Sequence, residues 1–136
     1  MTRYVIGADV ALRLAQNETV IADGHHIVAP TLIRSQVLAT LYRSVRRSEM
    51  TRADADHHLD YLRRLRMRLL GDRVLQTVAW RIADRLDWAD TFNAEYIAVT
   101  QLQADAFITL DPALAEVAAE LVAVAPIESL YSPGAP

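Results

Sequence analysis

A chain of 136 residues is long enough for one domain that buries roughly two-thirds of the surface exposed by its unfolded chain. With 52% hydrophobic residues, 23% charged residues and a net charge of −3, the composition excludes a disordered chain. Cysteine is absent, which excludes disulfide scaffolds, thiolate metal sites and thiol nucleophiles.

The charges are unevenly distributed. All fourteen basic residues are Arg and lie in residues 1–85 with nine acidic residues, whereas residues 86–136 hold eight acidic residues and no basic one. This asymmetry favours a basic face for an anionic partner, although subunits that pair opposite faces would explain it equally well. Charges interrupt the long apolar stretches, so we expect no membrane segment, no signal peptide and a cytoplasmic location.

Apolar runs and helical periodicity predict alternating strands and helices. Asp9 suits the cap of a first helix, and Pro30 suits the first turn of a second. Thr51 with Asp54 suits the capped start of a third. The expected strands are residues 4–6, 27–29, 67–70, 106–109 and 121–124, and the expected helices are residues 9–14, 30–47, 51–65, 74–86, 88–100 and 112–119.

This alternation predicts an α/β fold with a small, mostly parallel sheet flanked by helices. We expect a single domain over residues 1–130 and a tail at 131–136. Ligands of such sheets collect beyond the carboxyl ends of the strands. The polar or small residues expected there are Gly7, Asp9, Gln36, Asn93 and Asp111.

Four segments carry a resemblance to a known family. They are YVIGADVAL at 4–12, AP at 29–30 followed by SQV at 35–37, NAEYIA at 93–98, and ADAFITLD at 104–111. In order and spacing they resemble a PIN domain of the VapC toxin type over nearly the whole chain. The resemblance implies a PIN-like fold and an endoribonuclease in which four acidic side chains hold Mg²⁺ or Mn²⁺ and activate water. It also implies a VapB-like antitoxin as partner and a homodimer.

Three of the family's four acidic positions hold other residues here. The first falls on Gly7, the second on Gln36 and the third on Asn93, which leaves Asp111 in register. The two amides keep the shape of a carboxylate without its charge, so we expect Mg²⁺ affinity to fall severely. Asp9 lies two residues after Gly7, and its carboxylate can approach the same cleft.

The candidate site therefore combines the family positions with nearby acids. Catalytic positions are assigned to Asp9, Gln36, Asn93 and Asp111, and metal binding to Asp9, Asp111 and Asp90, which lies one helical turn before Asn93. Each assignment has a structural alternative. Asp9 and Asp111 also suit helix caps, and the two amides suit ordinary hydrogen-bonding roles.

Arginines on the predicted long helix are candidates for RNA binding. Arg43 and Arg47 could contact phosphates, although a solvated helix face explains them too. The leucines at 59, 62 and 65 suit the core or a dimer interface. Two functions remain open. One is a VapC-like endoribonuclease with weak or lost catalysis, and the other is a non-catalytic protein that binds RNA or a VapB-like antitoxin.

Overall fold

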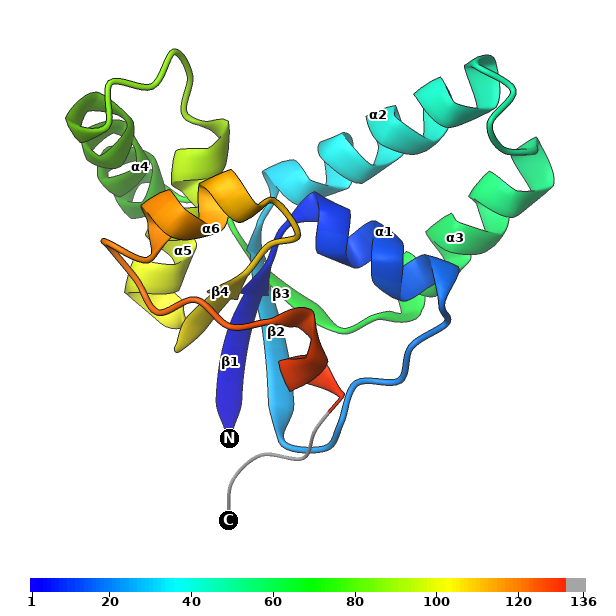
Figure 1. Ribbon diagram of the computed structural model, residues 1–136, viewed down its shortest axis with the longest axis horizontal. Helices are drawn as coiled ribbons and strands as arrows, with labels where there is room; N and C mark the ends of the chain where they lie inside the picture. Colours follow the sequence, from blue (N-terminus) through cyan, green and yellow to red (C-terminus); the bar gives the residue numbers. More distant parts are fainter. Residues whose placement is uncertain (132–136) are drawn as a thin grey trace.

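A parallel sheet lies at the centre of the molecule, with helices around it (Figure 1). The structure is a computed structural model and describes residues 1–131. Its strands are β1 (Thr2–Ile6), β2 (His25–Pro30), β3 (Met67–Leu70) and β4 (Ala106–Ile108). Its helices are α1 (Ala8–Gln16), α2 (Leu32–Arg46), α3 (Arg52–Arg64), α4 (Arg73–Arg85), α5 (Phe92–Gln103), α6 (Pro112–Ala118) and the 3₁₀ helix η1 (Ile127–Leu130). The predicted α/β fold class is confirmed.

The strand order creates a crevice at one end of the sheet. Neighbouring strands are parallel in the order β3-β2-β1-β4. The chain moves outward from β1 to β3 and then crosses to the opposite edge at β4. Because crossovers between parallel strands are right-handed, this reversal places α4 and α5 on the face opposite α1, α2 and α3. The crevice therefore opens beyond the carboxyl ends of β1 and β4, where ligands of such sheets bind.

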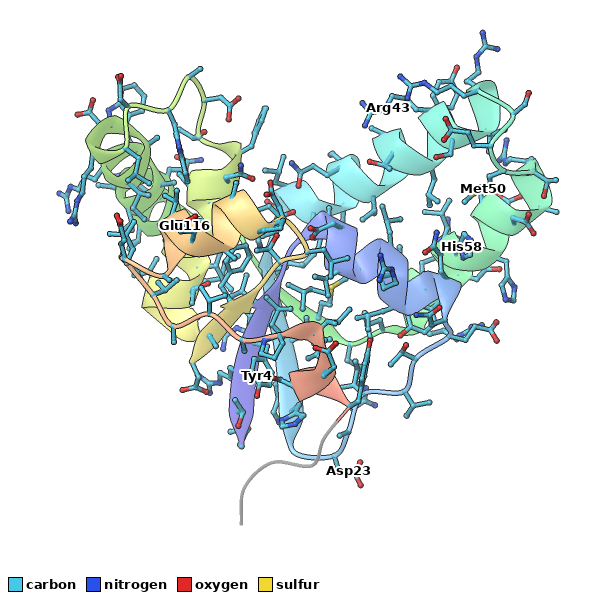
Figure 2. All side chains as sticks on the ribbon, in the orientation of Figure 1. Tyr4, Asp23, Arg43, Met50, His58 and Glu116 are labelled. Carbon is cyan, nitrogen blue, oxygen red and sulfur yellow. The ribbon has the colours of Figure 1, made fainter. Side chains whose placement is uncertain are left out.

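Apolar side chains from both layers of helices fill the space around the sheet (Figure 2). The strand residues that lead into the crevice, Ile6 and Ile108, are 0% exposed. Leu14 of α1 and Ile97 of α5 are also 0% exposed. Full burial of such a side chain contributes roughly 2 kcal/mol. The loops after β1 and β4 are therefore held by a firmly packed base.

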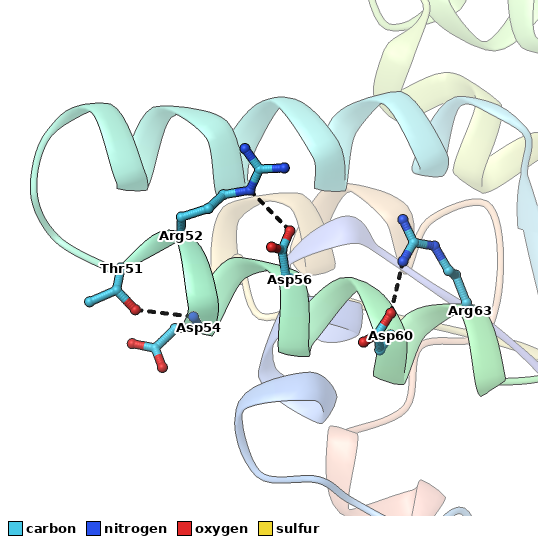
Figure 3. Close-up of polar contacts among 6 residues, drawn as sticks. All are labelled: Thr51, Arg52, Asp54, Asp56, Asp60 and Arg63. Atoms are coloured by element: carbon cyan, nitrogen blue, oxygen red, sulfur yellow. Dashed lines mark hydrogen bonds and ion pairs between the residues drawn. The ribbon is translucent and has the colours of Figure 1, made fainter.

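Two helices begin at the caps that the sequence contains. The hydroxyl of Thr51 accepts the amide of Asp54 at 3.1 Å, as predicted for the start of α3 (Figure 3). The carboxylate of Asp72 accepts the amide of Leu75 at 2.9 Å at the start of α4. Each bond satisfies an amide that has no partner inside the helix.

The second strand is longer than predicted at both ends. It begins at His25, and Pro30 is its last residue, paired with Leu70, instead of opening the long helix. The helix starts at Leu32. The amide of Thr31 donates to the Leu70 carbonyl at 2.9 Å and extends the contact with β3 by one residue.

The helix predicted from Trp88 begins only at Phe92. Asp87 adopts a left-handed φ of 55° directly after α4, which turns the chain away from the helix axis. The segment between α4 and α5 is therefore a loop. A positive φ is uncommon outside glycine, although Asp adopts it more readily than most residues, so the sequence contains only a weak signal for this turn.

The strand predicted at 121–124 is not formed. A single bridge joins Val124 to Phe107 of β4, and the Ala125 amide donates to the Phe107 carbonyl at 2.9 Å. The next residue, Pro126, has no amide to continue the ladder. Of the predicted tail, residues 132–136 lie outside the described residues. Across residues 1–131, no helix has both the length and the apolar character needed to cross a membrane.

Candidate functional site

A cleft of about 420 Å³ opens at the carboxyl ends of β1 and β4. Five predicted positions lie together in its lining, although they come from separate parts of the chain between the end of β1 and the start of α6. They are Gly7, Asp9, Gln36, Asn93 and Asp111. The crevice created by the strand order is therefore lined by the residues that the sequence places beyond strand ends.

Asp9 joins two segments that are distant in the sequence. It lies in the first turn of α1 rather than at its cap, which is Gly7. Its Oδ1 accepts the Val10 amide at 2.8 Å, and its Oδ2 accepts the Leu110 amide at 2.9 Å and the Thr109 hydroxyl at 3.2 Å. The carboxylate thus holds the start of α1 to the loop after β4, with both oxygens engaged.

Gly7 leaves room for this arrangement. A Cβ atom at position 7 would lie 2.5 Å from Asp9 Oδ1, closer than real contacts allow. The backbone of Gly7 is extended, with a φ of −71°, so its conformation does not require glycine. The space taken by the Asp9 carboxylate, and not backbone strain, disfavours a side chain at this position.

Asp111 caps α6. Its Oδ1 accepts the amides of Ala113 at 3.0 Å and Leu114 at 3.3 Å, and Pro112 occupies the first helical position. This is the cap role that the sequence left open as an alternative to metal binding. The same carboxylate also lines the cleft, so the two roles share one group.

Of the predicted site residues Asn93 and Asp90, only Asn93 lines the cleft. Asn93, in the first turn of α5, lines the cleft and is exposed. Asp90 is not among the cleft-lining residues, and its Oδ1 accepts the Phe92 amide at 3.0 Å in the loop before α5. The proposed metal role of Asp90 assumed a helix that already included position 90. The later start of α5 removes that basis.

Gln36 is held by Tyr96, a residue that was not among the predicted site residues. The Tyr96 hydroxyl donates to Gln36 Oε1 at 2.5 Å, which links α5 to α2 across the cleft. Tyr96 is 3% exposed. Burial raises the pKa of its phenol, and the charges of Asp9 and Glu95 raise it further. The available signal was spacing, because Tyr96 lies three residues after Asn93 and so on the same helix face.

We expect Tyr96→Phe to lower the free energy of unfolding by about 1 kcal/mol at neutral pH, since one hydrogen bond is lost. In the unfolded chain tyrosine ionises near pH 10. Because the folded protein retains the Tyr96 proton, its stability is complete below about pH 10 and declines above it. Urea unfolding at pH 7 and pH 11 should show a smaller decline for Tyr96→Phe. The matched control is Tyr42→Phe, at a tyrosine that is 64% exposed, and an equal effect of both variants would contradict this account.

Of the two arginines proposed to contact RNA, one lies at the cleft. Arg43 lines it from α2 (Figure 2), and its Nη2 lies 3.5 Å from the Thr40 hydroxyl. Arg47 follows α2 as its C-cap and is exposed outside the cleft lining. Arg47 lies four residues after Arg43, about one helical turn further along α2. The positive charge at the cleft therefore continues outward to the end of this helix.

The donor set does not fit the metal centre that the resemblance implies. Asp9 and Asp111 are the acidic residues in the cleft lining, and both carboxylates already accept backbone amides. The amide oxygen of Gln36 already accepts the Tyr96 hydroxyl. Within residues 1–131, no group of three or more His, Cys, Asp or Glu side chains is placed to share an ion. The cleft therefore offers a divalent cation two carboxylates, both engaged by backbone amides, instead of the four that the resemblance implies.

Comparison with known proteins places the fold. No protein-family model matches the sequence, and no curated protein matches it significantly. The crystal structure of PAE2754 from Pyrobaculum aerophilum superimposes with a TM-score of 0.73 over 95% of this chain and 93% of that chain, at 20% identity. The crystal structure of VapBC2 from Rickettsia felis bound to a DNA fragment from their promoter contains a chain with a TM-score of 0.63, over 91% of this chain and 98% of that one, at 10% identity.

These superpositions span almost the full length of both partners. At this low identity the agreement concerns the fold. The chain therefore has the PIN-like fold that its sequence resembles.

Proposed function

We propose that this chain is a VapC-like PIN-fold protein whose ancestral Mg²⁺- or Mn²⁺-dependent RNA cleavage is weak or lost, and that it binds RNA at the cleft without efficient cutting. The observation that carries the proposal is the state of the cleft oxygens. The carboxylates of Asp9 and Asp111 serve as hydrogen-bond acceptors for backbone amides. The positions between them in the chain hold the neutral amides of Gln36 and Asn93.

The same substitutions favour phosphate binding. Four carboxylates in one cleft would repel a phosphodiester unless a cation offset them. This cleft holds two carboxylates together with Arg43, and the hydroxyls of Ser35 and Thr40 also line it. Amides and hydroxyls can donate hydrogen bonds to phosphate oxygens. The cleft therefore tolerates an RNA backbone without a metal ion.

We further propose a VapB-like antitoxin as protein partner and a homodimer as the working unit, in the cytoplasm. The antitoxin proposal is supported by the fold that this chain shares with a chain of the VapBC2 structure, since the name VapBC2 denotes a VapB together with a VapC. Analytical ultracentrifugation of the purified chain tests the homodimer. Co-expression with the gene product encoded next to it tests the antitoxin.

Metal titration and RNA cleavage test the proposed loss of catalysis. We expect calorimetry with Mn²⁺ to give no binding up to millimolar metal, and we expect no cleavage of single-stranded RNA with Mg²⁺ or Mn²⁺. The physical reason is the missing negative charge at positions 7, 36 and 93. Cleavage by the wild-type chain that Asp111→Ala abolishes would overturn this part of the proposal.

RNA binding is tested separately through Arg43. We expect Arg43→Glu to weaken the affinity for single-stranded RNA roughly tenfold and to reduce the salt dependence, because one phosphate contact is lost. Fluorescence anisotropy at several salt concentrations measures both quantities. Arg81→Glu, at an exposed arginine of α4, makes the same charge change away from the cleft and serves as control. Equal losses in the two variants would show that only net charge matters.

A further inference from the structure

The half of α2 that follows the cleft residues leads away from the sheet (Figure 1). Its exposed side chains include Tyr42, Arg43 and Arg46, and the exposed Arg47 follows as the C-cap. Residues four apart lie on one helix face, so Tyr42 lies beside Arg46, and Arg43 lies beside Arg47. We call these four residues the α2 strip. Since Arg43 lines the cleft, the α2 strip begins at the proposed RNA site and continues outward from it.

The charge of the α2 strip is of one sign. No residue of α2 is acidic, and the first acidic residue after the helix is Glu49. Among residues 1–131, none of the three arginines of the strip forms an ion pair. One helical turn separates Arg43 from Arg47, a rise of about 6 Å along the axis. The strip therefore attracts the phosphates of a strand that leaves the cleft.

Tyr42 presents an aromatic ring between these cations. The residue is 64% exposed, and in the described part of the chain its ring contacts no other aromatic ring. Proteins that bind single-stranded nucleic acid combine a basic path for the backbone with aromatic rings on which bases stack. The α2 strip contains both parts, and its ring face is open to a ligand.

The charges near Tyr42 distinguish it from the other exposed rings. The described part of the chain also exposes Trp80, Phe92 and Tyr131. Each of these has an acidic residue within four positions along the chain, at 84, 90 and 128. The residues within four positions of Tyr42 include Arg43 and Arg46 and no acid. Because carboxylates repel phosphates and guanidinium groups attract them, Tyr42 is the exposed ring best placed to receive a base of a bound strand.

We propose that single-stranded RNA leaves the cleft along the α2 strip, with one base stacked on Tyr42 and with its phosphates paired with Arg46 and Arg47. The inference rests on the proposed RNA binding at the cleft and adds to it the stacking residue Tyr42 and the phosphate contact Arg46. A base stacks on a side chain only when it is free of its complementary strand. The ligand is therefore unpaired RNA that extends past the cleft.

Anisotropy with two labelled oligonucleotides separates stacking from charge. One is a single-stranded RNA, and the other has the same length with abasic riboses, so it keeps the phosphates and lacks the bases. The variants of the full chain are Tyr42→Ala, Tyr42→Phe, which keeps the ring, and Arg46→Gln. The controls lie on α4: Trp80→Ala removes a ring that is 71% exposed, and Arg81→Gln removes an exposed positive charge.

We expect Tyr42→Ala to weaken the affinity for the base-bearing RNA at least about fivefold, because the stacked base loses its partner. Its affinity for the abasic strand should stay within about twofold of wild type, as should both affinities of Tyr42→Phe and of the two controls. Arg46→Gln should weaken the binding of both oligonucleotides. It should also lower the slope of log affinity against log salt by about 0.7, since one phosphate contact is lost.

The proposal is overturned if Tyr42→Ala binds the base-bearing RNA like wild type, or if it weakens the binding of both oligonucleotides equally. It is also overturned if Trp80→Ala costs as much affinity as Tyr42→Ala. Should Tyr42→Ala have no effect while Arg43→Glu still weakens RNA binding, the proposed function stands and the inference about Tyr42 fails. A wild-type chain that binds no RNA overturns both.

Discussion

Restoring the acidic set is expected to create a metal-dependent nuclease. The variant Gly7→Asp, Asp9→Ser, Gln36→Glu and Asn93→Asp should bind Mn²⁺ on the order of 100-fold more tightly than wild type, because the cleft then holds four carboxylates instead of the two of Asp9 and Asp111. Cleavage of single-stranded RNA should appear with bound metal. Calorimetry and a gel assay of RNA length measure the two effects, after circular dichroism has checked that the variant is folded.

The change at position 9 clears the space that a side chain at position 7 would enter. A Cβ atom at position 7 would lie 2.5 Å from Asp9 Oδ1, so Gly7→Asp alone must displace a carboxylate that holds three hydrogen bonds. The version that keeps Asp9 serves as comparison and should be less stable and less active. The account of lost catalysis fails if the folded variant with Asp9→Ser binds Mn²⁺ no better than wild type.

Asp9→Ala is expected to lower the free energy of unfolding by about 3 kcal/mol. The substitution removes the acceptor of the Leu110 amide and the Thr109 hydroxyl, two of the hydrogen bonds that join the start of α1 to the loop after β4. Bonds to a charged acceptor are stronger than neutral ones, and the Leu110 amide loses its partner. Urea unfolding followed by circular dichroism measures the change.

The control is Asp84→Ala, which makes the same substitution at an exposed position near the end of α4. It should change stability by less than about 0.5 kcal/mol. If Asp9→Ala proves as mild as this control, the carboxylate does not hold the two segments together. Asp9 would then be free to serve a bound ion.

The sequence predicted the fold well because its signals were local. Apolar periodicity and caps such as Thr51 depend on residues within one or two turns of each other, and the structure reproduces them. The predictions that failed depended on context beyond such a window. The loop at 88–91 follows from the backbone turn at Asp87, and the strand at 121–124 is reduced to one bridge with β4, because Pro126 has no amide to continue the ladder.

The candidate site was predictable in position and not in detail. Parallel topology brings strand ends to one edge, so Gln36, Asn93 and Asp111 could be placed near one another before any coordinates were known. Hydrogen bonds between residues distant in the chain could not be predicted in this way. The bond from Tyr96 to Gln36 and the bond from the Leu110 amide to Asp9 each join groups that no spacing rule relates.

The close approach between positions 7 and 9 constrains the mutational history of this cleft. A variant with an acid at position 7 and Asp9 still present is expected to be less stable, because the Cβ of residue 7 would lie 2.5 Å from Asp9 Oδ1. An acid at position 7 is therefore easier to accommodate once position 9 has changed, because the Asp9 carboxylate otherwise has to leave its hydrogen bonds to make room.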